Sequence, residues 1–241
     1  MSKLCLILTG QMRTFDCKQI VDSYNRYLSS YEVDLYLFTW TNRGYSNNHG
    51  KTDVHPLQED EMTKTMIESH YSQFPFVTIR TIMLDNFCDF VEALSEPMKK
   101  IYHTPFRNHS KVTTSIPIEY KYQQALQFLE TVDTSYSKVM MTRPDVALVN
   151  ELPLTPFLEN NIYYIHTCVR CMDHGWFSTS NTATKLLKTL STDYLENHQT
   201  ITSRNHNNKD NNELLLYQCF IQGIKVNVLE GKLFHVCHFK K

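Results

Sequence analysis

Leu4 to Leu8 reads LCLIL, and Thr9 and Gly10 follow it at once. The run is apolar at every position, whereas a strand with one face in water alternates apolar and polar residues. Continuous hydrophobicity is typical of a strand that is buried on both faces, as in the parallel sheet of an α/β protein. The run is also too short to span a membrane. It therefore predicts a buried strand of a mostly parallel sheet.

The residues that follow this strand predict a helix and a second buried strand. Asp16 is a candidate cap for a helix that extends to about Ser29, and Val33 to Phe38 reads VDLYLF. Strand, helix and strand in this order form a βαβ unit with a right-handed crossover. Further along, the pattern predicts helices over 57–71, 87–102 and 118–132, strands over 76–82 and 137–142, and polar loops over 39–56 and 104–115.

Beyond residue 150 the pattern becomes irregular. It predicts short strands, one helix, and a late helix that begins at Asn211 or Asn212 and that Gly223 ends. We expect one domain over residues 1–241, with a regular half over 1–150 and a mixed half over 151–241. The strands of the mixed half are expected over 161–166, 175–180, 226–229 and 233–236, and its first helix over 182–190.

Composition excludes several classes of protein. The chain has 241 residues, 41% of them hydrophobic and 20% charged, with a net charge of −1. A near-zero charge without long runs of one sign argues against binding to nucleic acid or anionic lipid. The 7 cysteines are an odd number in a chain of this size, which favours a reducing, cytoplasmic location (the host cytoplasm, for a viral protein). No run approaches the ~20 apolar residues of a transmembrane helix.

Arg143-Pro144-Asp145 ends the strand predicted over 137–142. Pro144 has no N–H to donate, so the chain leaves the sheet at this point. Here Asp145 would lie at the carboxyl edge of the sheet, where open α/β sheets bind their ligands. Arg143 is a candidate for binding a diphosphate and Asp145 for holding a divalent cation. The alternative is an Arg–Asp pair that fixes the turn.

Two further segments end at the same predicted edge. Gly10 allows a ligand to approach the backbone closely, and the helix start beyond it favours anions. The segment matches neither a GxGxxG nor a Walker pattern, and a tight turn with an exposed Arg13 is the alternative. Trp40, after the second strand, is a candidate for stacking on a base or sugar. A buried core tryptophan is its alternative.

Three segments together resemble nucleotide-sugar glycosyltransferases of the GT-A family. They read LILTGQMRTF from Leu6, DLYLFTW from Asp34 and KVMMTRPDVAL from Lys138. More narrowly, they are similar to glycosyltransferases of large DNA viruses and of bacterial surface-polysaccharide clusters. Those proteins share a GQxR turn after the first strand and an R-x-D in place of the usual D-x-D. The match extends over 4–13, 34–40 and 120–149, with fainter similarity at 173–180 and from residue 213 onward.

The resemblance implies a GT-A-like (Rossmann-like) fold with a mostly parallel central sheet flanked by helices. Residues 1–150 would bind the nucleotide sugar, and residues 151–241 would form a mixed lobe on the acceptor side. The nucleotide would lie at the first turn, with Arg13 near the diphosphate and Thr9 or Gln11 near the base or ribose. The helix before Arg143 lines the donor site in such proteins. The resemblance thus makes Lys121 and Gln124 of this helix candidates for reaching a phosphate. By composition, however, both indicate the solvated face of an amphipathic helix, which is the favoured interpretation.

The metal site departs from the family pattern. Two acids usually bracket the cation, but Arg143 occupies the first of these positions, and Asp145 matches the second. The expected cation is Mn²⁺ or Mg²⁺, and Arg143 is a candidate to replace part of its function. Some similar enzymes use a late histidine as a metal ligand, which makes His235 a candidate. His238 would point to the opposite face of the same strand, and a structural role is the alternative for both.

An inverting transfer needs a carboxylate that accepts the proton of the attacking hydroxyl. In the resembling proteins the region of Asp173 faces the acceptor, so Asp173 is one candidate for this base. Glu213 is the other, although an acid in a first helical turn is also favoured by the helix dipole. The C-x-x-C of Cys168 and Cys171 has no second pair at zinc-site spacing and is interpreted as coincidence.

The sequence thus predicts a glycosyltransferase that transfers a sugar from a nucleoside diphosphate to a hydroxyl group of a glycan or glycoprotein. Two alternatives remain. A non-catalytic relative would bind nucleotide or carbohydrate without transfer, and the missing first acid supports it. A sugar nucleotidyltransferase would need a glycine-rich first loop with a lysine, which TGQMR lacks.

Overall fold

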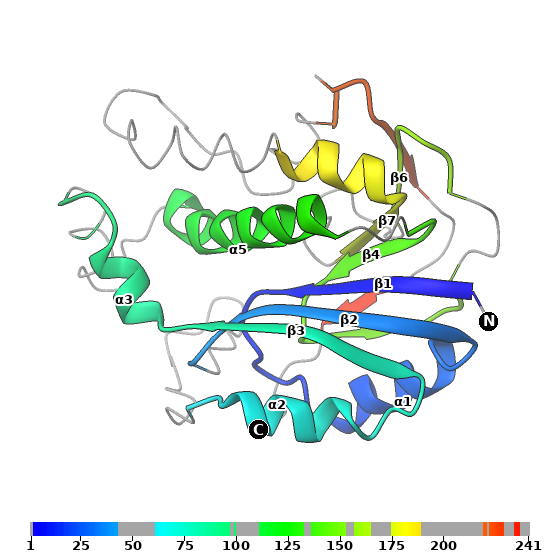
Figure 1. Cartoon of the computed structure of the whole chain (residues 1–241), viewed down its shortest axis with the longest axis horizontal. Helices are drawn as coiled ribbons and strands as arrows, with labels where there is room; N and C mark the ends of the chain where they lie inside the picture. Colours follow the sequence, from blue (N-terminus) through cyan, green and yellow to red (C-terminus); the bar gives the residue numbers. More distant parts are fainter. Residues whose placement is uncertain are drawn as a thin grey trace.

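A computed structural model describes residues 2–42, 61–96, 99, 111–132, 136–152, 157–164, 175–188, 219–220, 222–228 and 234–236. Within these residues a mixed sheet of seven strands has the order β3-β2-β1-β4-β7-β6-β8 (Figure 1). Strands β3, β2, β1 and β4 are parallel to one another, whereas β7 runs antiparallel to both β4 and β6. The expected α/β fold with a mostly parallel sheet flanked by helices is therefore confirmed.

The regular half contains four of the parallel strands and most of the described helices, and in the mixed half β6 and β8 are parallel to each other. The strands of the regular half are β1 (Ser2–Thr9), β2 (Tyr31–Trp40), β3 (Val77–Asp85) and β4 (Val139–Thr142), and its helices are α1 (Lys18–Tyr27), α2 (Lys64–Tyr71), α3 (Phe87–Glu92) and α5 (Lys111–Thr131). The mixed half adds β6 (Asn161–Tyr164), β7 (Gly175–Ser178) and β8 (Lys225–Val228), while β5 (Val146–Leu148) and β9 (Phe234–Val236) form a separate antiparallel pair. Residues 180–188 are helical.

Several predicted boundaries need correction. Helix α1 begins at Lys18 and its N-cap is Cys17, which makes no side-chain capping bond, so the prediction that Asp16 caps this helix is wrong. Helix α5 begins at Lys111 rather than at residue 118 and contains Pro117, so polarity alone was misleading over 111–115. Gly223 does end the late helix, in the left-handed conformation (φ 64°) that glycine adopts without strain.

Strand β1 is buried on both faces, as its continuous hydrophobicity predicts. Leu4, Leu6 and Leu8 contribute to a core cluster with residues of α1 and α2, and Cys5 and Ile7 contribute to a second cluster with residues of α5 and of helix 180–188. Figure 1 shows α1 and α2 on one side of the sheet and α5 on the other. The two clusters cover both faces of the sheet, and the shared direction of β1, β2, β3 and β4 places their carboxyl ends at one edge.

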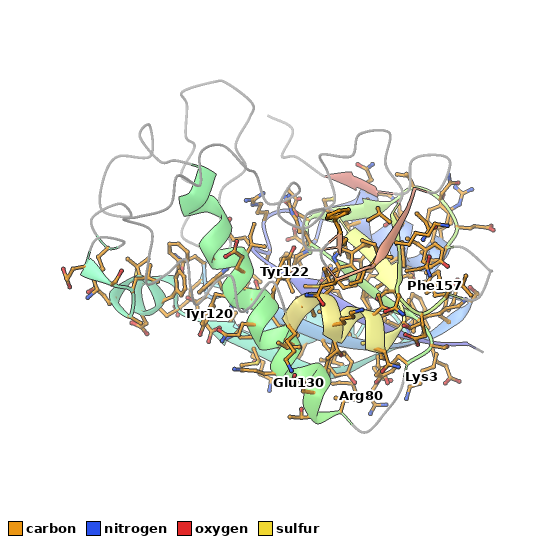
Figure 2. All side chains as sticks on the ribbon, turned by 90° about the horizontal axis from the view of Figure 1, so that it is seen from above. Lys3, Arg80, Tyr120, Tyr122, Glu130 and Phe157 are labelled. Carbon is orange, nitrogen blue, oxygen red and sulfur yellow. The ribbon has the colours of Figure 1, made fainter. Side chains whose placement is uncertain are left out.

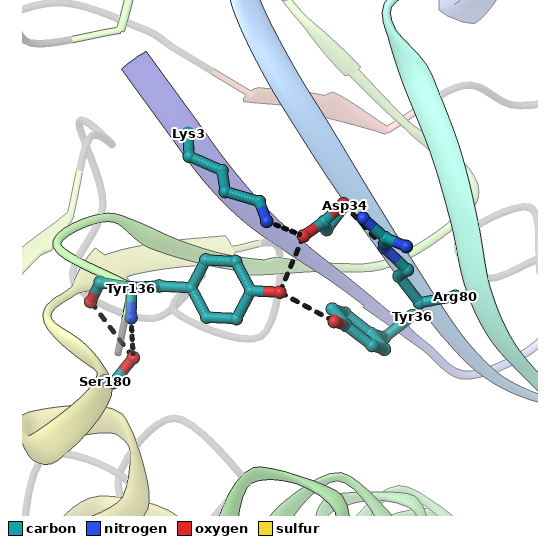
Figure 3. Close-up of polar contacts among 6 residues, drawn as sticks. All are labelled: Lys3, Asp34, Tyr36, Arg80, Tyr136 and Ser180. Atoms are coloured by element: carbon teal, nitrogen blue, oxygen red, sulfur yellow. Dashed lines mark hydrogen bonds and ion pairs between the residues drawn. The ribbon is translucent and has the colours of Figure 1, made fainter. Parts of the chain in front are cut away.

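A polar cluster ties three strands together near the amino end of the sheet (Figure 3). The buried Asp34 carboxylate on β2 lies 2.9 Å from the Lys3 ammonium and 2.8 Å from the Arg80 guanidinium. It also accepts a hydrogen bond from the Tyr136 hydroxyl at 2.7 Å. Burial alone would raise the pKa of Asp34, but hydrogen bonds from Tyr136, Lys3 and Arg80 lower it.

Tyr136 precedes β4, so this cluster fixes the approach of the chain to the strand that ends at Arg143. The Tyr136 and Tyr36 hydroxyls are 2.7 Å apart. Because Tyr136 donates its proton to Asp34, Tyr36 is the donor in that pair. The Tyr136 backbone N–H donates to the Ser180 hydroxyl at 2.9 Å, which links β4 to helix 180–188.

Candidate functional site at the carboxyl edge of the sheet

The turn after β4 places Asp145 against the first loop of the chain. The Val146 N–H donates to the Arg143 carbonyl at 3.3 Å, so Arg143 to Val146 form a tight turn. Pro144 takes the second position of this turn, where its fixed φ is favoured. Strand β5 then leaves the sheet toward β9. The predicted exit of the chain at Arg143-Pro144-Asp145 is therefore what the structure shows.

Asp145 is a buried carboxylate held by two arginines. Its Oδ1 accepts a hydrogen bond from Arg143 Nε at 2.9 Å, and its Oδ2 accepts one from Arg143 Nη2 at 2.6 Å. Arg13 Nη1 donates to the same Oδ2 at 3.3 Å from the loop after β1. The Asp145 side chain is 2% exposed, whereas those of Arg13 and Arg143 are 31% and 20% exposed.

The charge of Asp145 persists in spite of its burial. Burial on its own would raise the pKa of this carboxyl group, because the charged form loses hydration. The positive charges of Arg143 and Arg13, with their hydrogen bonds, outweigh this effect and lower the pKa of Asp145 below its ordinary value. Two cations and one anion leave the cluster of Arg13, Arg143 and Asp145 with a net charge of +1, which suits an anionic ligand.

The conformation of the loop after β1 fixes the position of Arg13. Met12 and Phe15 on either side are buried in the core, with exposed fractions of 0% and 4%. Arg13 has a positive φ of 36°, which is uncommon for a side chain of this size. Its Nε donates to Gln11 Oε1 at 3.2 Å, so that Gln11 also orients the guanidinium. The alternative of a tight turn with an exposed Arg13 holds for the turn, but the Arg13 side chain is 31% exposed and bonded to Asp145.

Gly10 allows the chain to turn at the end of β1. Its φ is 110°, in a region that side-chain-bearing residues rarely adopt. The Gly10 N–H donates to the Phe38 carbonyl at 3.1 Å, and its carbonyl accepts from the Thr39 hydroxyl at 2.6 Å. Thr9 is buried, with 4% exposed. Gln11 is more exposed than Thr9 and is therefore the more accessible of the two candidates for contact with the base or ribose.

Trp40 is a core side chain. It is 2% exposed, and its ring packs against the rings of Phe87, Phe90 and Tyr120 at centroid distances of 5.2, 5.0 and 5.8 Å. A base or sugar cannot stack on a ring that is already covered. The prediction that Trp40 stacks on a ligand is therefore replaced by its alternative, a buried tryptophan at the end of β2.

Lys121 and Gln124 are buried too, and the prediction of a solvated helix face is wrong. Lys121 is 0% exposed and pairs with Asp85, the last residue of β3. Its Nζ also donates to Gln124 Oε1 at 3.1 Å, and Gln124 Nε2 donates to Asp85 Oδ2 at 2.6 Å. The Lys121 ammonium lies 4.0 Å from the centre of the Trp40 ring. Burial lowers the pKa of Lys121 to about 8, although Asp85 opposes this shift.

Asp85 therefore belongs to a second polar cluster at the carboxyl edge, which is absent from the residues predicted from sequence. Strand β3 extends to Asp85, beyond the predicted end at residue 82, and Asp85 pairs in register with Trp40. Figure 2 shows Tyr120, the neighbour of Lys121 on α5, and Lys3 at opposite ends of the sheet. A carboxylate that ends a strand directly before a helix was the available signal.

The described residues at Asp145 do not fit a divalent cation. Both carboxylate oxygens already accept arginine N–H groups, and the side chain is 2% exposed. Within the described part of the chain, no group of three His, Cys, Asp or Glu side chains could hold a metal. Strand register places His235 opposite Ala147, two positions from Asp145, but its side chain is not among those described.

The two candidate bases, Asp173 and Glu213, lie outside the described residues, as do His238 and the C-x-x-C cysteines. Their proposed roles stay predictions. Cys5, Cys17, Cys88 and Cys219, which are described, are free thiols. In the described ranges we find no helix with the length and apolar character needed to cross a membrane.

No protein-family model and no curated protein sequence matches the chain. Among solved structures, glycosyltransferase GlyE of Streptococcus pneumoniae TIGR4 is similar in fold. Its apo form has a TM-score of 0.45 at 8% identity, over 93% of this chain and 44% of GlyE. A second GlyE structure gives 0.45 and 8%, over 95% and 45%. This chain thus spans less than half the length of GlyE.

A galactosyltransferase, LgtC, solved with donor and acceptor sugar analogues, is also similar in fold. Its TM-score is 0.43 at 9% identity, over 94% of this chain and 72% of LgtC. Identities and scores of this size describe a likeness of overall architecture and say nothing about activity. The narrower resemblance to viral and bacterial surface-polysaccharide enzymes stays a prediction.

Proposed function

We propose that the chain is a glycosyltransferase that uses a nucleoside diphosphate sugar as donor and a hydroxyl group of a glycan or glycoprotein as acceptor. One observation carries the proposal: Arg13 and Arg143, from the turns after two parallel strands, meet on one buried carboxylate at the carboxyl edge of the sheet. Open α/β sheets bind ligands at that edge. Guanidinium groups match the oxygens of a diphosphate in geometry and charge.

The proposed reaction breaks the bond between the sugar C1 and the β-phosphate oxygen, whose electron pair stays on that oxygen. The acceptor oxygen forms a new bond to C1, and its proton passes to a base. The products are a glycoside and a nucleoside diphosphate. Arg13 and Arg143 would stabilise the negative charge that develops on the leaving phosphate, which is where fixed positive charge accelerates such a transfer.

The other predicted residues have supporting roles in this proposal. Gly10 would allow the donor to approach the backbone, and Gln11 would hold Arg13 in place, as its 3.2 Å contact supports. Asp173 or Glu213 would accept the proton of the acceptor hydroxyl. Substitution of each by Asn or Gln, with the release of nucleoside diphosphate as readout, distinguishes the two.

Donor use is tested by the release of nucleoside diphosphate from a panel of uridine, guanosine and thymidine diphosphate sugars. We expect one member of the panel to be consumed by the wild type and not by Asp145→Ala. Arg143→Lys keeps the charge but loses the planar fork, and we expect it to reduce kcat/KM at least about tenfold. The matched control is Arg26→Lys at an exposed position of α1, which should leave turnover unchanged.

Two other results would each identify a different function. Nucleotide binding without turnover of any donor would indicate a non-catalytic binding protein. Turnover of a sugar 1-phosphate with a nucleoside triphosphate would indicate a nucleotidyltransferase. An Asp145→Ala variant that transfers sugar as fast as the wild type would contradict the assignment of the site itself.

A further inference from the structure

We propose that Asp145 is a positioning residue that holds Arg13 and Arg143 as a two-arginine clamp for a diphosphate, and that it is not the ligand of a divalent cation. The inference depends on the proposed function for the identity of the substrate. The clamp itself can be tested with a simple anion and without any transfer reaction.

The contacts of Asp145 are those of a guanidinium-binding carboxylate. Arg143 meets both of its oxygens, at 2.9 and 2.6 Å, in the two-point geometry that arginine and carboxylate prefer. Arg13 adds a third hydrogen bond at 3.3 Å. Mg²⁺ binds carboxylate oxygens at about 2.0–2.1 Å and keeps several waters. A carboxylate with a 2% exposed side chain, already in contact with two arginines, leaves no such space.

Charge leads to the same conclusion. Sites for divalent cations are built from several oxygen or nitrogen ligands whose total charge is negative or zero. Here the two side chains that bond to the Asp145 carboxylate are both positive, and Arg13, Arg143 and Asp145 together carry a net charge of +1. A divalent cation placed at Asp145 would be repelled by Arg13 and Arg143, whereas a diphosphate would be attracted by them.

The Asp145 carboxylate offsets the repulsion between the two arginines and restricts their rotamers. Guanidinium groups that converge on one anion repel each other, and each has many rotamers in the absence of ligand. Asp145 lies between them and bonds to both, so the two groups are placed before a ligand arrives. The Arg143 and Arg13 side chains remain 20% and 31% exposed, whereas Asp145 is hidden behind them.

Binding of inorganic pyrophosphate in EDTA, measured by titration calorimetry, tests the clamp. We expect the wild type to bind it. Asp145→Asn keeps the size of the side chain and makes the cluster more positive, so simple electrostatics predicts tighter binding. A positioning role predicts the opposite, a loss of about tenfold, because the arginines are no longer held together. Equal or tighter binding by Asp145→Asn would overturn the proposal.

A second variant distinguishes loss of the clamp from a folding defect. Arg143→Lys keeps the charge of the clamp and removes its two-point contact, and we expect it to weaken pyrophosphate binding by about tenfold as well. Far-ultraviolet circular dichroism and thermal unfolding check that each variant is folded. Unchanged pyrophosphate affinity in a folded Arg143→Lys protein would also overturn the proposal.

Titration with Mn²⁺ alone, followed by electron paramagnetic resonance, tests the competing role. A positioning role predicts the same Mn²⁺ binding in the wild type and in Asp145→Asn. Loss of a bound Mn²⁺ in the variant would identify Asp145 as a cation ligand and would contradict the proposal. The two proposals fail separately. Pyrophosphate binding without turnover of any donor would refute glycosyl transfer and support the two-arginine clamp. Transfer that depends on Mn²⁺ held by Asp145 would support glycosyl transfer and refute the clamp.

Discussion

The ammonium group of Lys121 lies 4.0 Å from the centre of the Trp40 ring and pairs with Asp85 at the end of the neighbouring strand. Lys121 is 0% exposed and the Asp85 side chain 31%. A lysine with no access to water depends entirely on these partners for its charge to be stable in the fold. The pair thereby connects α5 to the carboxyl ends of β2 and β3.

Lys121→Met should destabilise the protein. Methionine fills a similar volume but cannot pair with Asp85 or interact with the Trp40 ring as a cation. Because Asp85 is partly hydrated and burial already disfavours the charged lysine at pH 7, we expect the free energy of unfolding to fall by only about 1–2 kcal/mol, less than for a fully buried pair. Urea unfolding measures this change. Lys18→Met removes the exposed Lys18–Asp22 pair, whose side chains are 86% and 59% exposed, and should change little.

The contribution of Lys121 to stability should also depend on pH. Its pKa is lowered from 10.5 to about 8 in the folded protein, first by burial and against the effect of Asp85. Between these two values the unfolded chain binds more protons than the folded one, so stability rises with pH. The stability advantage of the wild type over Lys121→Met should therefore be larger at pH 10 than at pH 7. A difference that shrinks over this range would show that burial does not dominate.

Tyr136→Phe should weaken the polar cluster at the amino end of the sheet. The variant leaves the buried Asp34 carboxylate without one hydrogen-bond donor and leaves the Tyr36 hydroxyl without its acceptor. A lost hydrogen bond to a buried charged group reduces the free energy of unfolding by about 1.5–3 kcal/mol. Tyr36→Phe removes only the bond between the two hydroxyls and should cost less. A double-mutant cycle of both substitutions measures their coupling, and strict additivity would contradict the network.

Gly10→Ala and Gly223→Ala should differ in cost. At both positions an added Cβ would meet no atom within 4 Å, so the expected effects come from the backbone alone. Gly223 has φ 64°, where other residues are tolerated at about 1–2 kcal/mol. Gly10 has φ 110°, outside that region, and we expect Gly10→Ala to cost about 2–3 kcal/mol. Thermal unfolding of both variants checks the order, and equal costs would refute it.

The buried sheet and its edge could be predicted from local sequence. LCLIL has no polar position, and Pro144, two positions after the last residue of VMMT, forces the chain out of the ladder. These signals depend on residues that are close together in the sequence, so they can be interpreted without knowledge of the fold. The Arg143–Asp145 pair was foreseen as an alternative for the same reason, since its members are two positions apart.

Contacts between distant segments could not be predicted in this way. Arg13 meets Asp145 across 132 positions, and Lys121 meets Asp85 across 36. From sequence alone, a lysine in a helix is predicted to be exposed to solvent unless its buried partner is known. The same holds for Asp34, a charged residue in an apolar strand, whose ion-pair partners Lys3 and Arg80 lie on two other strands.

The pairing of β1 with β4 sets the order in which the chain can fold. Cys5 to Leu8 align with Val139 to Thr142, so one edge of the buried strand β1 has no partner until a segment much later in the chain has been synthesised. Until then its backbone N–H and C=O groups offer a template to any other extended chain. Fragments that end before residue 139 should therefore aggregate more readily than fragments that extend through β4 and its other neighbour, β7. During translation, the segment that completes the arginine clamp is also the one that closes this edge.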